Sequence, residues 1–319
     1  MKSGSKLHAG ALVACLAACM LPLAASAQTA QTAPPPAAAT DDAAQIAQAT
    51  KKFNAYVDFL NRTLRAEEAL DRYKSWVNWA TGPTGRERII YGLYSPYDTK
   101  REAEAATNAL TAEPLLPDLD AAMREYVAAV SALSPILVAA DGYYERKDYK
   151  DDAMAQGKVL HAQIVAASGP FLSARAKVDA LLRVEKAKAD VRRLDALEKR
   201  EGRSADWQVA NVMLRARRVM DLLPSNAKPV VDLAAFHDAM ADYAKAVKEF
   251  DGYQAAKPNA FSAFGSEPSS LLGKLRDFQE AVERVKGDAR RAGGDQLTWI
   301  VNDFNMMVTV SQSATIFNK

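Results

Sequence analysis

Residues 53–77 read FNAYVDFLNRTLRAEEALDRYKSWV, and this stretch decides the fold class. Its large apolar residues recur every three or four positions, which places them on one face of a helix. Strand-like alternation is hard to find here or further along the chain, where alanine, leucine, lysine, arginine and glutamate dominate. The sequence therefore predicts an all-α protein whose first helix spans about residues 42–79. The recurring positions are Phe53, Tyr56, Val57, Leu60, Leu64, Leu70, Tyr73 and Val77.

Prolines and glycines divide the remainder of the chain, so we predict an elongated helical bundle of about seven helices. The second helix follows Pro117, and Pro135 is expected to kink it because proline removes a backbone donor. The third begins near Tyr149, is interrupted at Gly169-Pro170 and resumes to about residue 199. The last four are expected at about 205–223, 231–253, 269–289 and 296–315.

Two segments of the chain resemble each other. AMREYVAAV at 122–130 matches AMADYAKAV at 239–247 at most positions. Asp-Gly-Tyr follows each segment, at 141 and 251, and Gly-Lys follows in turn, at 157 and 273. Because three marks recur in the same order, we predict one domain built from two related helical halves packed face to face.

The first residues have the layout of a secretory leader. Lys2 and Lys6 precede an apolar stretch, and Ala25-Ser26-Ala27 offers a cleavage site before Gln28. The preceding Leu-Ala-Ala-Cys also fits the lipoprotein pattern, in which Cys19 would be acylated. Both alternatives predict export from a bacterial cytoplasm, to a soluble periplasmic state or to a lipid tether at the outer membrane. A lipid anchor at Cys19 is then the expected contact with a membrane.

The composition limits which chemistry and which partners the rest of the chain can have. Cleavage after Ala27 removes both cysteines, so no disulfides or thiol chemistry are expected. It leaves 39 basic residues (41 − 2) against 39 acidic ones, which argues against nucleic-acid binding because that needs a basic surface. The predicted organisation is a signal peptide at 1–27 (or a lipoprotein leader at 1–18), an Ala/Pro-rich linker at 28–40 and a single helical domain at 41–319.

The acidic segment around residue 150 has two interpretations. Asp148, Asp151 and Asp152 lack the alternating spacing of a calcium loop, and acids at a helix start favour capping. His161 and His237 lack zinc-site spacing, and no motif for a nucleophile or phosphate loop is present, so no metal or cofactor is predicted. The alternative is an envelope hydrolase or metal-dependent enzyme in which His161 acts as a general base beside the three aspartates.

Nine of the eleven tyrosines lie between residues 56 and 149, and three of them repeat every third residue in a loop that contains glycine and proline. Tyrosine offers a flat apolar face and a hydroxyl, which suits sugars, peptides and protein partners. We therefore predict a non-enzymatic binding module whose surface forms where 86–97 meets 143–152. Alternatively, the rings cover the end of the bundle, or the chain is a structural spacer. The candidate residues are Tyr91, Tyr94, Tyr97, Tyr143, Tyr144, Tyr149 and His161.

Several motifs carry a family resemblance. They are Lys52-Phe53-Asn54-Ala55-Tyr56-Val57 with Asn61, Tyr73 with Trp76-Val77, Gly82-Pro83-Thr84-Gly85-Arg86-Glu87, Tyr91-Gly92-Leu93-Tyr94, Tyr143-Tyr144, Tyr149-Lys150-Asp151-Asp152 and Gly157-Lys158-Val159-Leu160-His161. With these motifs the chain resembles the YiiG-like family of bacterial envelope proteins, most specifically over residues 52–161. The resemblance implies an exported, often lipid-anchored, helical protein without an established activity.

Overall fold

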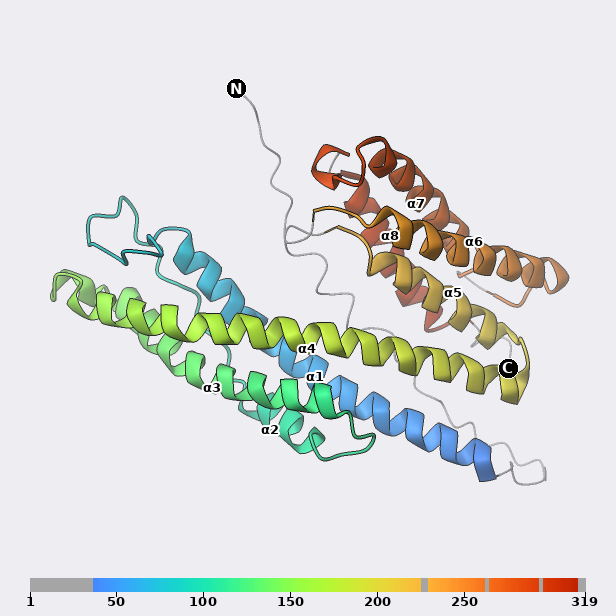
Figure 1. Cartoon of the computed structure of the whole chain (residues 1–319), viewed down its shortest axis with the longest axis horizontal. Helices are drawn as coiled ribbons and strands as arrows, with labels where there is room; N and C mark the ends of the chain where they lie inside the picture. Colours follow the sequence, from blue (N-terminus) through green and yellow to red (C-terminus); the bar gives the residue numbers. More distant parts are fainter. Residues whose placement is uncertain (1–36, 225–228, 262–263, 293–294, 315–319) are drawn as a thin grey trace. The chain divides into compact units, whose positions relative to one another are not determined.

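The computed structural model describes residues 37–224, 229–261, 264–292 and 295–314. The expected leader, Cys19 and most of the expected linker lie outside these ranges. Within them the chain forms α-helices, short 3-10 turns and one isolated β-bridge, so the all-α prediction is confirmed (Figure 1). The eight α-helices are α1 (Ala37–Lys74), α2 (Lys100–Ala109), α3 (Pro117–Arg146), α4 (Ala155–Glu201), α5 (Ala205–Met220), α6 (Leu233–Ala256), α7 (Glu267–Arg284) and α8 (Asp295–Ser311).

The structure differs from the prediction in three places. α2 was not predicted, since its sequence KREAEAATNA presents little apolar bulk. α4 begins at Ala155 rather than near Tyr149, because α3 continues to Arg146 and Lys147 then adopts a left-handed φ of 63°. The expected interruption at Gly169-Pro170 was wrong, and α4 runs through it. Both residues are exposed, so water can solvate the carbonyl that the proline leaves without a donor.

The chain divides into two compact units, one of residues 40–189 and one that includes residues 190–319. The segments that resemble each other lie one in each unit, within α3 and α6. Tyr126 and Tyr243 hold corresponding places in the two segments, and both side chains are completely buried. Each Asp-Gly-Tyr lies in the second half of its helix, and each Gly-Lys lies in the next helix.

In the unit of residues 40–189, α1, α3 and the first part of α4 lie side by side (Figure 1). Three polar side chains, one from each helix, connect them through hydrogen bonds. The Arg175 guanidinium on α4 donates to the Tyr126 hydroxyl on α3 at 2.9 Å, and that hydroxyl lies 2.5 Å from the Thr63 hydroxyl on α1. The Tyr126 ring stacks on Phe171, with ring centroids 5.7 Å apart. These hydrogen bonds therefore help to fix the register of the three helices.

A buried ion pair also joins α1 to α3. The Lys52 ammonium lies 2.8 Å from the Asp120 carboxylate and donates to the carbonyls of Ala112 and Pro114 at 3.0 and 2.9 Å. Asp120 also accepts from the Tyr56 hydroxyl at 2.6 Å and from the backbone of the loop before α3. All three ammonium protons and both carboxylate oxygens thus have partners, as a buried pair requires. α3 is the one helix in the described ranges that is long and apolar enough to cross a membrane by length and composition alone, and it carries Asp120 of this pair.

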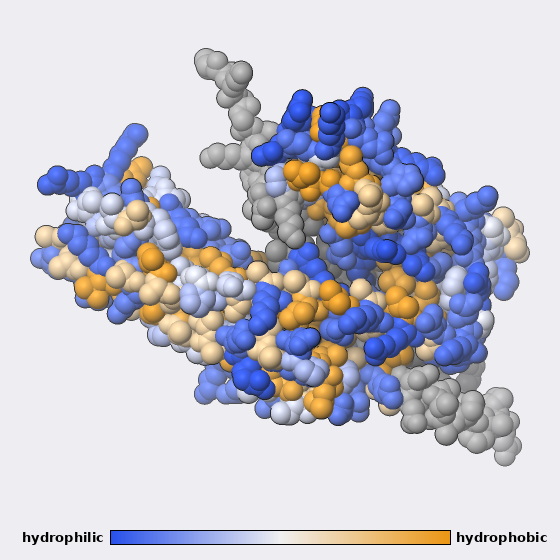
Figure 2. Space-filling view, in the orientation of Figure 1, coloured by the Kyte–Doolittle hydropathy of each residue, from blue (hydrophilic) through white to orange (hydrophobic). Residues whose placement is uncertain are grey.

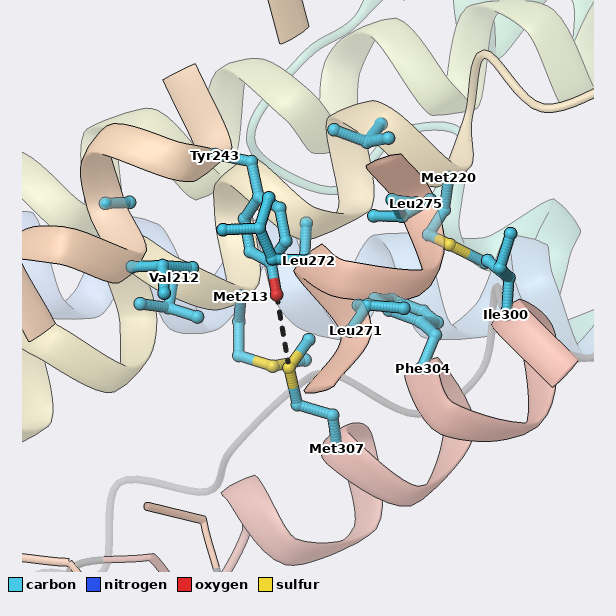
Figure 3. Packing of buried hydrophobic residues seen from close by; sticks show 14 of the residues in the cluster. Val212, Met213, Met220, Tyr243, Leu271, Leu272, Leu275, Ile300, Phe304 and Met307 are labelled. Atoms are coloured by element: carbon cyan, nitrogen blue, oxygen red, sulfur yellow. Dashed lines mark hydrogen bonds between the residues drawn. The ribbon is translucent and has the colours of Figure 1, made fainter. Parts of the chain in front are cut away.

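In the other unit, α5 to α8 enclose a separate apolar core (Figure 3). Tyr243 of α6 lies at its centre, where its hydroxyl donates to the Pro268 carbonyl at 2.9 Å and contacts the Met307 sulfur at 3.9 Å. Phe304 and Ile300 of α8 approach the same region from the next turns of that helix (Figure 3). One buried hydroxyl therefore finds an acceptor within an apolar core, which avoids the cost of an unpaired polar group.

Candidate functional site

The loop between α1 and α2, residues 75–99, packs back onto the junction between α3 and α4. The Trp76 indole donates to the Gly92 carbonyl at 2.7 Å, which closes the loop on itself. A Cβ added at Gly92 would lie 3.4 Å from the Cβ of Tyr144, and one added at Gly85 would lie 3.7 Å from the Cβ of Met154. Both glycines have positive φ, which explains their use in these turns. The loop of residues 86–97 thus contacts the segment 143–152 through Gly92 and Tyr144.

Beneath this loop lies an aromatic cluster, formed by Tyr73, Trp76, Trp79, Tyr143, Tyr144, Tyr149 and His161. Its rings meet mostly edge to face, with centroids 5.0 to 6.4 Å apart. The side chains of Tyr143 and Tyr144 are 4% and 5% exposed, and Tyr149 is partly buried against both. These three tyrosines pack the end of the helices and present little ring surface to a partner.

His161 is a buried member of this cluster. Its Nδ1 lies 3.2 Å from the Tyr73 hydroxyl, and its ring lies 5.9 Å from the Trp79 ring. Burial lowers the pKa of His161 below its usual value, and a hydrogen bond with the Trp79 backbone opposes this only in part. A general base of the expected kind needs a carboxylate partner, and no hydrogen bond or ion pair joins His161 to a carboxylate in the described ranges.

Two of the three aspartates of the α3–α4 junction have separate partners. Asp152 accepts from the Gln156 backbone at 2.8 Å and from the Tyr143 hydroxyl at 2.7 Å, which lowers its pKa. It therefore caps the start of α4, as predicted. Asp148 pairs with Arg146 at 2.6 Å, and Asp151 is exposed. The described residues contain no group of three acidic, histidine or cysteine side chains that could hold a metal ion.

Burial raises the pKa of tyrosine hydroxyls in the cluster, among them Tyr73 and Tyr144. Burial raises the pKa of Tyr73 to about 12, and burial beside Tyr73 raises the pKa of Tyr144 as well. The Tyr144 hydroxyl faces that of Tyr73 but makes no hydrogen bond of standard geometry. One buried carboxylate oxygen of the nearby Glu87 also has no hydrogen-bond partner among the described residues. Both tyrosines therefore remain neutral near pH 7 and are poor candidates for acid–base chemistry.

The stability of the protein should depend on pH through His161. The unfolded chain takes up a proton near pH 6.5, whereas the folded protein, with its lowered His161 pKa, does so at lower pH. The contribution of His161 is thus complete above about pH 6.5, and stability is lost as the pH falls from there to the folded pKa, by at most about 1.4 kcal/mol per pH unit. Urea unfolding of wild type and His161→Leu between pH 5 and 8 measures this slope. Equal slopes in the two proteins would contradict it.

The exposed side of the same loop carries a tyrosine–arginine ladder, defined as Tyr91, Tyr94 and Tyr97 with Arg62, Arg65 and Arg72 of α1. The Tyr94 ring lies between two guanidinium groups, with Arg65 at 4.0 Å and Arg72 at 4.5 Å from its centroid. Tyr97 lies 4.6 Å from Arg62, and Tyr91 lies 5.9 Å from Arg72. Such contacts attract electrostatically, and each contributes about 0.5–1 kcal/mol at exposed sites.

Backbone hydrogen bonds attach the ladder to α1 at both ends. Arg72 donates from Nε and Nη2 to the Tyr91 carbonyl at 3.1 and 3.0 Å, and Arg62 donates from Nε to the Asp98 carbonyl at 2.9 Å. Tyr91 and Tyr97 are each 50% exposed. The arginines therefore hold the loop in place while half of each terminal ring faces solvent.

The seven candidate residues fall into two groups. Tyr91, Tyr94 and Tyr97 lie in the surface ladder, whereas the other four belong to the aromatic cluster beneath it. Sequence reasoning did not include the ladder arginines. The sequence did contain a sign of these arginines, because three of them lie within eleven residues of α1 and off its apolar face.

Together, the fold and the site define an all-helical protein with tyrosine rings and arginines side by side on its surface. The chain belongs to the family described as "Protein of unknown function (DUF3829)", whose model matches residues 47–315. It is 28% identical over 259 residues to the "Uncharacterized protein YiiG" of Escherichia coli (strain K12), which covers 79% of this chain and 73% of that protein. The resemblance inferred from the motifs is thereby confirmed. No solved structure matches the chain.

Proposed function

We propose that this chain is a non-enzymatic binding module that holds a partner on the tyrosine–arginine ladder. One observation carries the proposal: Tyr91 and Tyr97 are half-exposed, and neighbouring arginines already hold both rings in place. Tyrosine and arginine dominate the binding energy of many protein interfaces. Rings that are ordered before binding lose less conformational entropy on association, so they favour affinity.

The alternative of an enzyme centred on His161 has weaker support. His161 is 8% exposed and has a tyrosine rather than a carboxylate as its side-chain hydrogen-bond partner. Asp152, the nearest in sequence of the three aspartates, has a different partner in Tyr143. The ladder is thus the better candidate for contact with another molecule.

We further propose that the module acts in the bacterial cell envelope. The leader pattern of residues 1–27 supports this, with either a soluble periplasmic form or a lipid tether at Cys19. Mass spectrometry of the N-terminal peptide from cells distinguishes the two forms, since it would begin at Gln28 or at an acylated Cys19. A mature chain that retains Met1 and its neighbours in the cytoplasm would contradict export.

Removing the exposed rings should abolish capture of the partner. We expect Tyr91→Ala/Tyr97→Ala to recover at least about tenfold less partner from envelope extract than wild type, because truncating a hot-spot tyrosine costs about 2 kcal/mol or more. The measurement is quantitative mass spectrometry of proteins retained by the immobilised mature chain.

The matched control is Trp299→Ala. Trp299 is 60% exposed and lies 6.0 Å from the Lys274 ammonium, so it is also an exposed ring beside a cation, but on α8. We expect this control to retain the partner, and urea midpoints establish that both variants are folded. An unchanged set of partners in the double variant would contradict the proposed function.

A further inference from the structure

The loop that carries the ladder tyrosines is locally basic, although the whole chain has a net charge of only +2. Residues 72–97 contain four cationic side chains and one acidic side chain, whereas residues 62–71 of α1 contain two arginines and three acids. The single acid, Glu87, accepts hydrogen bonds from the backbone and hydroxyl of Thr84. Arg86 and Arg88 on either side of it are exposed, and Figure 2 shows a hydrophilic surface over the projecting part of this loop. The loop itself therefore presents more positive than negative charge.

The ladder arginines differ from most other surface arginines in their partners. Arg203 pairs with both Glu198 and Glu249, as is usual for an exposed guanidinium in this protein. Arg62 and Arg72, in contrast, bond to backbone carbonyls and tyrosine faces and form no ion pair within the described residues. Neither guanidinium is therefore closed off by an ion pair in the described residues, although Arg62 also interacts electrostatically with Glu102.

Hydrogen-bond donors remain free at both positions. Arg62 uses Nε alone and Arg72 uses Nε and Nη2, so the remaining guanidinium nitrogens can bind a ligand. The planar guanidinium fork matches a carboxylate with two parallel hydrogen bonds. Arg65 between them forms an ion pair with Glu68 at 2.9 Å, so Arg62 and Arg72 at the two ends are the ladder arginines without such a pair in the described residues.

The spacing of these ends limits the ligand. Ten residues of α-helix separate Arg62 from Arg72, which is about 15 Å at 1.5 Å per residue. An extended polypeptide covers that distance in about five residues. The exposed faces of Tyr91 and Tyr97 offer apolar contact along the same line.

We infer that the ladder binds an extended acidic polypeptide segment, with carboxylates near Arg62 and Arg72 and its backbone or side chains against the tyrosine rings. This inference rests on the proposed function and specifies its partner. Tyrosine and arginine are enriched at protein interfaces, which favours a polypeptide over an acidic polysaccharide.

A direct binding assay tests the charge class. Fluorescein-labelled hexaglutamate is titrated with the full mature chain, and fluorescence anisotropy reports binding in 50 and 200 mM salt. Hexaglutamine and polygalacturonate serve as an uncharged peptide and an anionic polysaccharide. We expect hexaglutamate to bind best and to weaken at the higher salt, because exposed charges are screened.

The variant Arg62→Gln/Arg72→Gln should weaken hexaglutamate binding at least about tenfold, since hydrogen bonds to charged groups contribute about 1.5–3 kcal/mol each. Arg203→Gln removes one exposed, paired guanidinium elsewhere and should leave binding unchanged. Equal binding by the double variant, a preference for polygalacturonate, or no binding of hexaglutamate would each overturn the inference. Failure of hexaglutamate to bind, together with capture of a partner from envelope extract that still requires Tyr91 and Tyr97, would support the binding module and reject an acidic polypeptide as its partner.

Discussion

Replacement of Lys52 by methionine should lower the free energy of unfolding by about 3–5 kcal/mol, the cost of leaving one member of a buried ion pair uncompensated. The Lys52 side chain is 0% exposed and the Asp120 side chain 8% exposed, so water cannot take the place of the ammonium group. The carbonyls of Ala112 and Pro114 would also lose their donor. Urea denaturation followed by circular dichroism measures the change.

The control is Lys177→Met. Lys177 pairs with Glu125 at 2.9 Å, almost the same distance as in the buried pair, but the two side chains are 50% and 58% exposed. We expect a loss of about 1 kcal/mol or less, because exposed ion pairs contribute little. A similar loss in both variants would show that Lys52 is not held in a desolvated environment.

Gly82→Ala should lower the free energy of unfolding by about 2–5 kcal/mol. Gly82 has a φ of 77°, which costs a residue with a side chain about 1–2 kcal/mol. The new Cβ would also lie 2.8 Å from Cδ2 of the buried His161 ring, and overpacking of this kind costs about 1–3 kcal/mol. The measurement is urea unfolding followed by tryptophan fluorescence, since the Trp79 ring contacts the affected His161 ring.

Gly202→Ala separates these two contributions. Gly202 has a similar φ of 65°, but no atom lies within 4 Å of the position of its Cβ. We expect this variant to lose only the backbone cost, about 1–2 kcal/mol. If Gly82→Ala were no more destabilising than Gly202→Ala, the close contact between the loop and His161 would be contradicted.

The periodicity of apolar residues was enough to predict the fold class and most of the helices. It works where large side chains face one core, as Phe53, Tyr56 and Leu60 do, all of them buried. It failed at α2, whose buried residues are two alanines, because alanine carries little periodic signal. It also gave no warning of Lys52, a charged residue next to the apolar series, because burial of a lysine depends on partners more than fifty residues away.

The candidate site was predicted in part. The spacing of Tyr91, Tyr94 and Tyr97 indicated a surface role, and two of these rings are half exposed. The adjacent Tyr143-Tyr144 pair gave the same signal but is buried, since composition alone does not distinguish a tyrosine that covers a core from one that faces solvent. The arginines of α1 belong to the site because the loop folds back onto them, and local sequence does not specify the path of the loop.

The central claim is that a partner contacts the ladder, and site-specific photo-crosslinking in living cells tests it most directly. A benzophenone amino acid placed at Tyr97 should form a covalent product with an envelope partner, whereas the same probe at Trp299, another exposed ring, should not. Arg62→Gln/Arg72→Gln in the Tyr97 probe strain should reduce that product. The absence of any product from the Tyr97 position, or equal products from both positions, would contradict the account.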